Sequence, residues 1–465
     1  MQRSEVASSS APGVSASTGM NSDCSALLTD LYELTMLQGY WRDEMYETAV
    51  FEFFVRDLPK RRNFLLAAGL EQAIRYLEEL EFSPAEIEWL GQTRRFQPEF
   101  VTWLKNLRFT GDVNAMPEGT VFFPNEPILQ VIAPLPEAQL VETRLINLLN
   151  FQTTIASKAA RSVLVAPGKM LVDFGLRRAQ GAEAGLMAAR ATYIAGFSGT
   201  STVLASQQFE IPIYGTMAHS FIQAHSDEMT AFTRFAEANP DNVVLLIDTY
   251  DTEAAAEKVV HLATQLKPRG IDVKAVRIDS GDLGSHARKV RQILDHGGLI
   301  NTEIFASGNL DEYVLQKLIE SGAPIDGFGI GTRLDTSSDA PYLDCAYKLM
   351  EYSGRPCRKR SEGKATWPGR KQVYRRFDRD GYIDRDALTV VEDRQEGEPL
   401  LRPVLRGGKR VEGPVALSIS RQYAARQLRS LPQRLRTLDQ VTEAFKINVS
   451  GSLQSLANAV DEQRH

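Results

Sequence analysis

The chain has 465 residues, of which 53 are Lys or Arg and 59 are Asp or Glu, so its formal net charge is −6. This balance gives no cationic field of the kind that nucleic-acid-binding proteins carry, and we expect no nucleic-acid partner. Hydrophobic residues make up 43% of the chain, which is enough for a large packed core. At about 100–200 residues per domain, this length predicts two or three domains.

Cysteine content and apolar runs bear on the compartment. Cys24, Cys345 and Cys357 are an odd number without CxxC spacing, so they predict neither a disulfide framework nor a cysteine zinc site. They favour a reducing, cytoplasmic environment. Residues 1–24 are rich in Ser, Ala and Gly and hold no apolar run, so we expect a disordered tail rather than a signal peptide. No run of about 18 apolar residues is present, and we expect no membrane span.

The first third of the chain mixes helix and strand patterns. Leucines at helical spacing predict a helix over 26–40, an apolar run predicts a strand over 49–59, and 63–80 reads as a strand or loop entering an amphipathic helix. Residues 111–134, punctuated by Gly and Pro, predict small antiparallel strands. Residues 137–165 predict a long helical stretch with a break near Asn150.

From about residue 170, short apolar runs alternate with helical patterns. Seven runs are candidate strands, with an eighth candidate at 343–350; the seven are 170–174, 194–197, 211–214, 243–248, 273–279, 303–307 and 325–331. The alternation predicts βα units and a parallel sheet, and hence an α/β fold. Seven or eight strands are enough to close a barrel, and an open doubly wound sheet is the competing topology.

Carboxylates recur at the ends of these runs. Asp173, Asp248, Asp279 and Asp282 lie at or just after the carboxyl end of a predicted strand. In a barrel these ends meet at one mouth, where the chemistry of such folds takes place. A single Asp here would more simply start a turn or cap the next helix, but the recurrence favours a site.

Two of the six histidines are close together, at positions 219 and 225. Six residues on an α-helix rotate two side chains about 120° apart, so a shared zinc ion is not favoured. His219 follows Gly215 and Thr216 directly after a predicted strand. That position suits a nucleophile or general base whose second ring nitrogen is oriented by a carboxylate. We interpret His225 as a packed structural residue.

Three glycine-bearing loops suit phosphate binding, because glycine lets backbone N–H groups approach phosphate oxygens. They are 196–201, 327–332 and the tripeptide at 307–309. Arg277 and Asp279 share one face of a predicted strand end and could bind anionic oxygens and a ribose or Mg²⁺. Residues 355–376 carry nine Lys or Arg against one acid, which from spacing alone favours a solvated basic loop over a phosphate-gripping segment.

At this point the motifs resemble one known family, the nicotinate phosphoribosyltransferases, which are type II phosphoribosyltransferases. The matching segments run in order from about residue 27 to 375; they are LLTDLYELTM (27–36), FEFFVRDLP (51–59), DFGLRRAQG (173–181), AGFSGTSTV (195–203), YGTMAHSF (214–221), LIDTYDT (246–252), VRIDSGDL (276–283), FASGNLDEY (305–313) and PGRKQVYR (368–375). The resemblance implies an irregular α/β barrel over 141–350. It also implies a second α+β domain made from 25–140 and joined by 351–465.

The resemblance also implies a reaction. The family joins nicotinate to the ribose of 5-phosphoribosyl 1-diphosphate, giving nicotinate mononucleotide and diphosphate in NAD salvage. ATP is hydrolysed alongside through a phosphohistidine, which matches His219, and Mg²⁺ is the expected cofactor. Catalytic roles would also fall to Arg277 and Asp279, the latter as partner of the ribose hydroxyls. Asp248 would bind Mg²⁺ or orient His219, and the sequence does not choose between these roles.

Substrate contacts follow from the same matching. The family works as a homodimer with shared sites, so Tyr32 of one subunit would stack on the pyridine ring opposite Phe174 of the other. Thr216 and Arg277 would contact nicotinate or the sugar, and Arg177 would steady a carboxylate or a phosphate.

The phosphate and the base each have further candidate residues. Ser307, Gly308, Gly331 and Thr332 would hold the 5′-phosphate. Where related nicotinamide enzymes carry an Asp, this chain has Ser201, which tolerates a carboxylate on the ring and so supports nicotinate over nicotinamide.

Two other readings stay open. One is a nicotinamide- or quinolinate-type phosphoribosyltransferase without obligatory ATP; quinolinate, with two carboxylates, would want a denser cationic pocket. The other is a barrel that has lost catalysis and binds metabolites, although that reading expects eroded sites while the motif residues here are intact.

Overall fold

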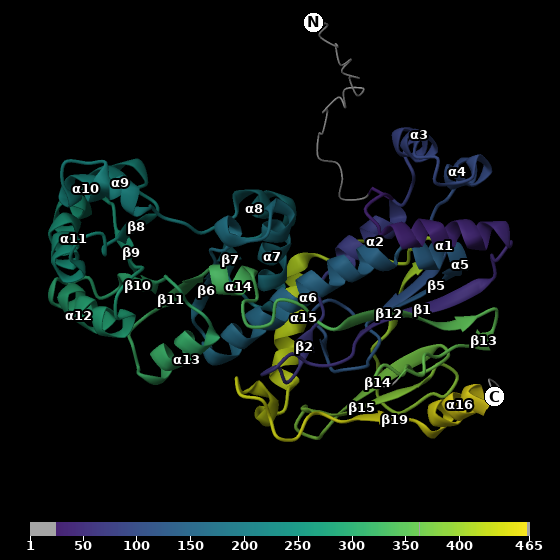
Figure 1. Ribbon diagram of the computed structural model, residues 1–465. Coiled ribbons are helices and arrows are strands. Elements are labelled where there is room, and N and C mark those ends of the chain that lie inside the picture. Colours follow the sequence, from purple (N-terminus) through teal and green to yellow (C-terminus); the bar gives the residue numbers. More distant parts are fainter. Residues whose placement is uncertain (1–24, 362, 463–465) are drawn as a thin grey trace, which may run out of the picture.

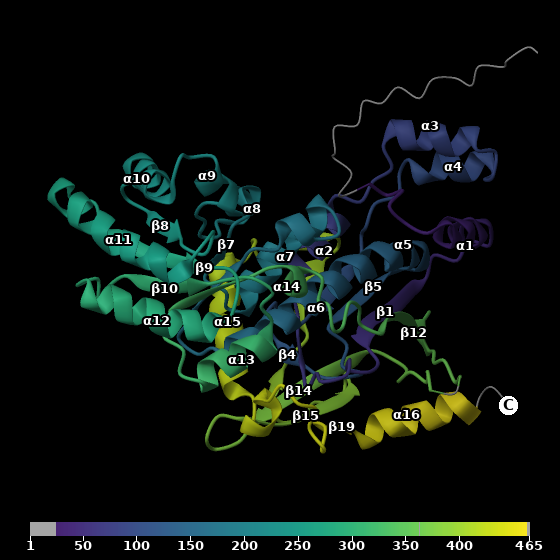
Figure 2. The same cartoon turned by 60° about the vertical axis from the view of Figure 1, so that its left-hand side comes forward.

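The computed structural model describes residues 25–361 and 363–462, so the tail expected over 1–24 lies outside the described residues. A six-stranded parallel sheet with its helices forms one end of the molecule, and a seven-stranded and a four-stranded sheet form the other (Figure 1). The long helix α6 (Glu142–Val165) lies between these two parts (Figures 1 and 2). None of the helices described is long and apolar enough to cross a bilayer.

Six parallel strands form the sheet that carries the predicted site residues. Their order is β7-β6-β11-β10-β9-β8, and every neighbouring pair is parallel. These strands are short and mostly buried because helices cover the sheet, which explains their continuous apolar runs. Their bounds are β6 (Met170–Asp173), β7 (Gly199–Thr200), β8 (Val243–Leu246), β9 (Val273–Ile278), β10 (Glu303–Ala306) and β11 (Gly327–Ile330).

The two edge strands, β7 and β8, are joined by a segment without a regular ladder. Ile213 forms an isolated parallel bridge with Thr200 at the end of β7. Three residues later, the Thr216 hydroxyl donates to the main-chain carbonyl of Val244 in β8. The chain from 213 to 216 therefore spans the gap between the edges. This is the irregular α/β barrel that the sequence predicts, with one irregular side.

The helices around this sheet begin at predictable residues. Asp227, Asp251, Asp282 and Asp311 each cap a helix by accepting from the backbone N–H three residues later. The helices of this part are α7 (Ala182–Ala195), α8 (Val203–Phe209), α9 (His219–Gln223), α10 (Glu228–Ala238), α11 (Thr252–Leu266), α12 (Leu283–His296), α13 (Glu312–Glu320) and α14 (Thr332–Asp335), with 3₁₀ turns η2 (Leu176–Arg178) and η3 (Lys267–Arg269). Their apolar faces and the strands share one core.

The other sheets combine the two ends of the chain. A seven-stranded sheet has the order β13-β12-β1-β5-β3-β17-β18, and a four-stranded sheet has the order β16-β14-β15-β19. The strands are β1 (Thr48–Val55), β2 (Leu65–Leu66), β3 (Asp112–Ala115), β4 (Val121–Phe122), β5 (Leu129–Pro134), β12 (Cys345–Tyr352), β13 (Arg355–Pro356), β14 (Lys371–Phe377), β15 (Ile383–Val390), β16 (Glu398–Pro399), β17 (Arg402–Arg406), β18 (Lys409–Arg410) and β19 (Ile447–Val449), with β2 and β4 forming a separate pair.

Helices from both chain ends pack against these sheets around a second core. They are α1 (Leu31–Arg42), α2 (Leu70–Glu78), α3 (Pro84–Gln92), α4 (Pro98–Leu104), α5 (Leu135–Leu140) and α16 (Gly451–Glu462). Helix α15 (Leu417–Ser430) and the 3₁₀ turn η4 (Gln433–Arg436) also come from the C-terminal part of the chain, but their buried residues belong to the core of the parallel sheet. The predicted strand at 49–59 and the small antiparallel strands within 111–134 are confirmed as β1 and as β3, β4 and β5.

Five sequence expectations about elements are wrong. The run at 211–214 is no strand, because only Ile213 there forms a bridge. The run at 194–197 ends helix α7 and is no strand, and the candidate barrel strand at 343–350 is β12, which pairs antiparallel with β1 in the other sheet. The expected helix break near Asn150 lies instead at Val141, between α5 and α6. The helical pattern over 217–238 is two helices, α9 and α10, because Asp227 starts a new one.

Candidate active site

Three predicted site residues form one hydrogen-bonded cluster at the carboxyl ends of β9 and β10. Arg277 donates through Nε to the Ser307 hydroxyl at 2.8 Å and through Nη2 to Oδ1 of Asp279 at 2.7 Å. The Ser307 hydroxyl also donates to Oδ1 of Asp279. Parallel pairing of β9 with β10 aligns these strand ends, so the cluster follows from the register.

The Asp279 carboxylate is held in its charged form. Burial alone raises its pKa, but hydrogen bonds from Ser307 and Arg277, together with the positive charges of Arg277 and His219, lower it below the ordinary value. No hydrogen bond to Asp279 Oδ2 occurs among the residues described. This oxygen is therefore available to a ligand hydroxyl or a cation.

Asp248 lies next to this cluster, after β8. Its Oδ2 accepts from the backbone N–H of Asp279 at 3.0 Å and from the Ser280 hydroxyl at 2.5 Å. Its Oδ1 is buried and has no partner in residues 25–361 and 363–462. A buried carboxylate oxygen without a donor is costly unless a cation or water meets it.

A complete all-protein metal site does not occur in the described part of the chain, where no group of three His, Cys, Asp or Glu side chains converges. Mg²⁺ needs less than that, since it is commonly bound through one or two carboxylates together with substrate phosphates. The orphaned Asp248 oxygen and the free Asp279 oxygen fit such a role. Asp282, which the sequence placed with them, caps α12 through Ser285 and is a structural residue.

His219 is the first residue of α9 and is partly exposed. Its Nδ1 lies 3.0 Å from the Thr249 hydroxyl, in the loop directly after Asp248. A carboxylate was expected beside this ring nitrogen, and the hydroxyl of Thr249 lies there instead. His225 packs against Phe221, with its Nδ1 2.7 Å from that residue's carbonyl, which agrees with its structural interpretation.

Aromatic and cationic groups meet above β11. The Arg277 guanidinium carbon lies 5.5 Å from the centroid of the Phe174 ring, within cation–π range. The Phe174 ring is tilted against Phe305 at 5.8 Å. A Cβ at Gly329 would lie 2.4 Å from the Phe174 ring, so glycine makes room for it. One ring face and one cation are thus fixed side by side at the mouth.

The loop after β10 approaches the cluster closely. Gly308 has φ +91, and a Cβ there would lie 1.9 Å from the Asp279 carbonyl oxygen. Asn309 is also left-handed, with φ 53. Only glycine tolerates the position at 308, which leaves backbone N–H groups near the strand end. After β11, Gly331 packs on the Phe174 carbonyl and Thr332 opens the short α14.

A buried pair of carboxyl groups supports this part of the mouth. Asp173 accepts from Gly175 N at 2.8 Å and from the Thr200 hydroxyl at 2.7 Å, and its carbonyl accepts from Ser201 N at 2.9 Å. Asp335 is fully buried beside it. Burial and the Asp173 charge raise the pKa of Asp335 well above its usual range, which favours the neutral form of this carboxyl. Asp173 thereby ties the loop after β6, which carries Phe174, to the loop after β7, which carries Ser201.

Three predicted residues stand apart from the cluster. Thr216 uses its hydroxyl to close the barrel side, and Arg177 is exposed on the turn η2. Tyr32 is 45% exposed on α1, which both views place far from β8 and β9 (Figures 1 and 2). Within one chain, Tyr32 cannot reach the mouth.

Part of the basic segment 355–376 is solvated, since Arg355, Lys359, Arg360 and Lys364 are exposed, and the rest packs into the fold. Arg375 is fully buried and forms a two-point ion pair with Asp386, and Lys371 is buried against Glu52. Arg358 pairs with Asp461 on α16. The solvated-loop interpretation therefore holds for the exposed part of the segment and is wrong for Lys371 and Arg375, whose acidic partners lie on other strands.

Comparison with known proteins agrees with this geometry. A model of the nicotinate phosphoribosyltransferase N-terminal domain matches residues 27–150, and the model of the nicotinate phosphoribosyltransferase family matches residues 170–354. The nicotinate phosphoribosyltransferase pncB2 of Mycobacterium tuberculosis is 46% identical over 445 residues, covering 95% of this chain and 96% of that protein. The chain belongs to the nicotinate phosphoribosyltransferase family of enzymes.

Further members and solved structures extend the match. The nicotinate phosphoribosyltransferase of Bacillus subtilis is 40% identical, covering 81% of this chain and 78% of that protein. The structure of human nicotinic acid phosphoribosyltransferase superposes with a TM-score of 0.83 at 30% identity, covering 93% of this chain and 99% of that one. A nicotinate-nucleotide pyrophosphorylase from Pyrococcus furiosus superposes with a TM-score of 0.72 at 26% identity, covering 89% and 97%. The family's fold thus extends over nearly the whole chain.

The sequence analysis did not single out several residues of this mouth. Thr249, Ser280, Thr200 and Asp335 contact or support predicted residues. The hydroxyls carry no sequence pattern of their own. One signal was available: Thr249 and Ser280 each directly follow an Asp at a predicted strand end.

Proposed function

We propose that this chain transfers the phosphoribosyl group of 5-phosphoribosyl 1-diphosphate to nicotinate, giving nicotinate mononucleotide and diphosphate in NAD salvage. The observation that carries the proposal is the cluster of Arg277, Asp279 and Ser307 beside the Phe174 ring at the barrel mouth. It combines a ring face, a cation and a charged carboxylate within one chain of this family.

The base binds between the aromatic face and the cation. The pyridine ring lies on Phe174, and its carboxylate meets the cationic side of the mouth formed by Arg277, with Arg177 on the neighbouring turn. Ser201, directly after β7 and bonded through its N–H to the Asp173 carbonyl, adds no negative charge that would repel this carboxylate. Stacking of this kind adds roughly 0.5–1.5 kcal/mol beyond area burial.

The ribose and its phosphate bind on the other side of the cluster. The free Oδ2 of Asp279 accepts from the ribose hydroxyls, while its Oδ1 is held by Arg277 and Ser307. The backbone at Gly308, with Gly331 and Thr332 directly after β11, cradles the 5′-phosphate. As diphosphate leaves C1, positive charge grows on the sugar ring, and the Asp279 carboxylate stabilises it.

Mg²⁺ supplies charge neutralisation for the leaving diphosphate when bound. Asp248 and Asp279 would hold it from the protein side, since each has a carboxylate oxygen without a donor in the described residues. Asp248 also holds the backbone of Asp279 and the Ser280 hydroxyl in place. This supports Asp248 as the cation ligand rather than the partner of His219, a role that the Thr249 hydroxyl fills.

ATP hydrolysis is coupled through His219. Thr249 holds the ring at Nδ1, which leaves Nε2 to attack the γ-phosphorus of ATP; the N–P bond forms as the bond to ADP breaks. The phosphohistidine adds about two negative charges close to Asp279 and the mouth loops. Water later takes the phosphoryl group and releases phosphate. Loss of ATP stimulation in His219→Ala, and its reduction in Thr249→Val, test this coupling.

A homodimer completes the site. Leu28, Leu31 and Tyr32 at the start of α1 are 45–52% exposed, and Leu176, Val203 and Tyr214 around the mouth are 38–71% exposed. If the α1 surface of one subunit packs against the mouth surface of the other, both apolar surfaces are buried. Tyr32 of the first subunit then lies over the pyridine ring, opposite Phe174 of the second.

One assay decides among the pyridine substrates. Nicotinate, nicotinamide and quinolinate are each offered with 5-phosphoribosyl 1-diphosphate and Mg²⁺, with and without ATP, and diphosphate release is measured. The proposal expects nicotinate to be used with kcat/KM at least about a hundredfold above the other two. Preference for nicotinamide or quinolinate would replace the proposed substrate, and ligand binding without turnover would restore the non-catalytic reading. Ser201→Asp is expected to weaken nicotinate use selectively.

A further inference from the structure

A second cavity lies at the opposite end of β6 from Asp173 and Phe174. It measures about 760 Å³ and is lined by the ends of α6 and α7, the loop before β6, one face of α15, and η4. The lining residues are Val163, Leu164, Ala166–Lys169, Leu171, Ala195, Gly196, Ser198, Arg421, Gln422, Ala425, Leu428, Arg429, Gln433, Arg436 and Thr437. We call it the α15 cavity. Its place at the amino ends of β6 and β7 separates it from the mouth.

The charged residues of the α15 cavity are all cationic. Lys169, Arg421, Arg429 and Arg436 line it, and no Asp or Glu does. None of the four is ion-paired with a carboxylate anywhere in residues 25–361 and 363–462. The chain as a whole has more acidic than basic residues and a formal net charge of −6. A cavity lined by four cations and no acid therefore departs from the composition of the rest of the chain.

Two of these arginines are fixed in place by main-chain carbonyls. Arg421 donates to the carbonyls of Phe197 at 3.1 Å and Gly196 at 2.9 Å, and its guanidinium lies 5.2 Å from the Tyr193 ring centroid. Arg436 donates to the Leu431 carbonyl at 2.9 Å and to that of Arg429. A guanidinium has five N–H donors, so each arginine keeps three that meet no partner in the described residues. They are pre-oriented donors.

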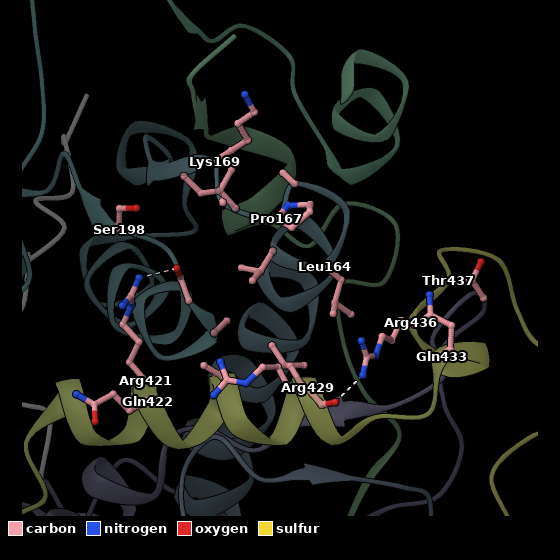
Figure 3. A pocket seen from close by; sticks show the side chains of 18 residues that line it. Leu164, Pro167, Lys169, Ser198, Arg421, Gln422, Arg429, Gln433, Arg436 and Thr437 are labelled. Atoms are coloured by element: carbon pink, nitrogen blue, oxygen red, sulfur yellow. Dashed lines mark hydrogen bonds between the residues drawn. The ribbon is translucent and has the colours of Figure 1, made fainter. Parts of the chain in front are cut away.

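The arrangement of the side chains is visible in Figure 3. Arg421 and Arg429 rise from the same face of α15, and Arg436 extends from η4 beside them. Leu164 and Pro167 form the facing wall, and Lys169 stands at the rim with its amino group directed away from α15. The Arg429 side chain has no hydrogen-bond or ion-pair partner among the residues described here. The arginine side chains on the α15 side of the cavity therefore lie opposite the apolar wall formed by Leu164 and Pro167.

Helix ends offset only part of this charge. Helices α6, α7 and α15 end at Val165, Ala195 and Ser430, close to the cavity, and each carbonyl end carries roughly half a negative charge. Together they balance at most about one and a half of the four positive charges. The remaining charge favours an anion, and the concave shape favours a small one over an extended polyanion.

We propose that the α15 cavity binds a phosphorylated small molecule of nucleotide size, with its phosphate oxygens on Arg421, Arg429 and Arg436. The volume falls within the range of roughly 300–1,000 Å³ that ligand pockets occupy. Arginine forks match phosphate geometry with two parallel hydrogen bonds. The apolar wall of Leu164 and Pro167 accepts the base of such a ligand. This site does not depend on the reaction proposed for the mouth.

The test measures binding of ADP by calorimetry to the full-length chain. Arg277→Ala is the background, so that binding at the mouth is weakened. We expect this variant to bind about one ADP per chain at the α15 cavity. Adding Arg429→Glu, an exposed residue whose change leaves the fold intact, is expected to weaken ADP at least tenfold. The matched control is Arg426→Glu on the same helix outside the cavity, which should stay within twofold.

Hydrogen exchange locates the bound ADP independently of any variant. Protection of amides in 163–171 and 421–437 supports the proposal. Three results would each overturn it. They are absence of ADP binding to the Arg277→Ala chain, equal ADP affinity in the Arg429→Glu and Arg426→Glu proteins, and protection confined to the barrel mouth. Turnover by Arg429→Glu alone should equal that of the unaltered chain, so failure here is distinguishable from failure of the proposed reaction.

Discussion

Arg277 and Asp279 stand two residues apart at the end of β9, joined by a hydrogen bond of 2.7 Å from Nη2 to Oδ1. The same guanidinium holds Ser307 and lies against the Phe174 ring. One side chain therefore connects the proposed base site with the proposed ribose site. Loss of this arginine should disturb both at once.

We expect Arg277→Lys to lower kcat/KM for nicotinate by on the order of a hundredfold. A lysine has no planar fork, so it cannot hold Asp279 and Ser307 while lying on Phe174. Steady-state kinetics of diphosphate release measure the change. The matched control is Arg269→Lys, an exposed arginine paired with Glu237. If both variants keep full kcat/KM, Arg277 has no part in the site.

Gly308→Ala should impair both folding and binding. The added Cβ would lie 1.9 Å from the Asp279 carbonyl oxygen, at a φ of +91 that alanine rarely adopts. We expect a loss of about 2–4 kcal/mol in the free energy of unfolding, and a raised KM for 5-phosphoribosyl 1-diphosphate.

The control for this glycine is Gly322→Ala. Gly322 also has a positive φ, +63, but an added Cβ there meets nothing within 4 Å. It should cost only about 1–2 kcal/mol and leave KM unchanged. Denaturant unfolding and steady-state kinetics of both variants separate backbone strain from the close approach to Asp279. If both variants lose the same free energy of unfolding and show the same KM, the close approach is not the cause.

Glu33, the residue after Tyr32, should make stability depend on pH. Burial raises the pKa of its carboxyl to about 7, opposed by hydrogen bonds from Gln139 and Tyr32. A raised pKa means that the folded chain takes up a proton, so this contribution to stability is present below about pH 4.5 and is lost as pH rises through 7. After allowance for solvent screening, we expect about 1–2 kcal/mol.

Unfolding in denaturant at pH 5 and pH 8 checks this. The free energy of unfolding should fall between these pH values by about 1–2 kcal/mol more in the unaltered chain than in Glu33→Gln, which cannot ionise. Glu99→Gln, at an exposed carboxylate on α4, is the control and should retain the full pH dependence. An unchanged slope in Glu33→Gln would show that another group is responsible.

Shared sites predict complementation between two defective chains. Tyr32→Ala and Arg277→Ala should each lose most activity alone. Because α1 and the mouth lie far apart in one chain, each site of the proposed dimer would take Tyr32 from one subunit and Arg277 from the other (Figure 1). After mixing and subunit exchange, half of the dimers would be mixed and hold one intact site. Activity should then recover to about one quarter of that of the unaltered chain. No recovery in mixtures shown to exchange subunits would place both residues in the same site or in none.

Sequence patterns predicted much of the fold. The strands β6 and β8–β11 are visible because a parallel sheet covered by helices is built from continuous apolar runs. The run at 194–197 failed because four apolar residues at the end of α7 look the same as a buried strand. β12 was recognised as a strand but placed in the wrong sheet, since local pattern does not contain its pairing with β1.

The meeting of polar side chains at the strand ends was predictable to a similar extent. Asp248, Asp279 and Ser307 were found because polar residues at parallel strand ends must meet. Asp282 followed the same rule but caps a helix. Thr249 and Asp335 were missed because their roles depend on neighbours 30 and 162 positions away, His219 and Asp173. The buried end of the basic segment, at Lys371 and Arg375, was misjudged because the acids that pair with it lie on other strands, which the local pattern does not show.

The most direct test of ATP coupling through His219 measures nicotinate mononucleotide formation. The unaltered chain and His219→Ala are compared, each with and without ATP. The account predicts product in both proteins, strong stimulation by ATP only in the unaltered chain, and label from γ-labelled ATP on that chain alone. Equal stimulation of both proteins by ATP, or no product from nicotinate in the unaltered chain, would contradict it.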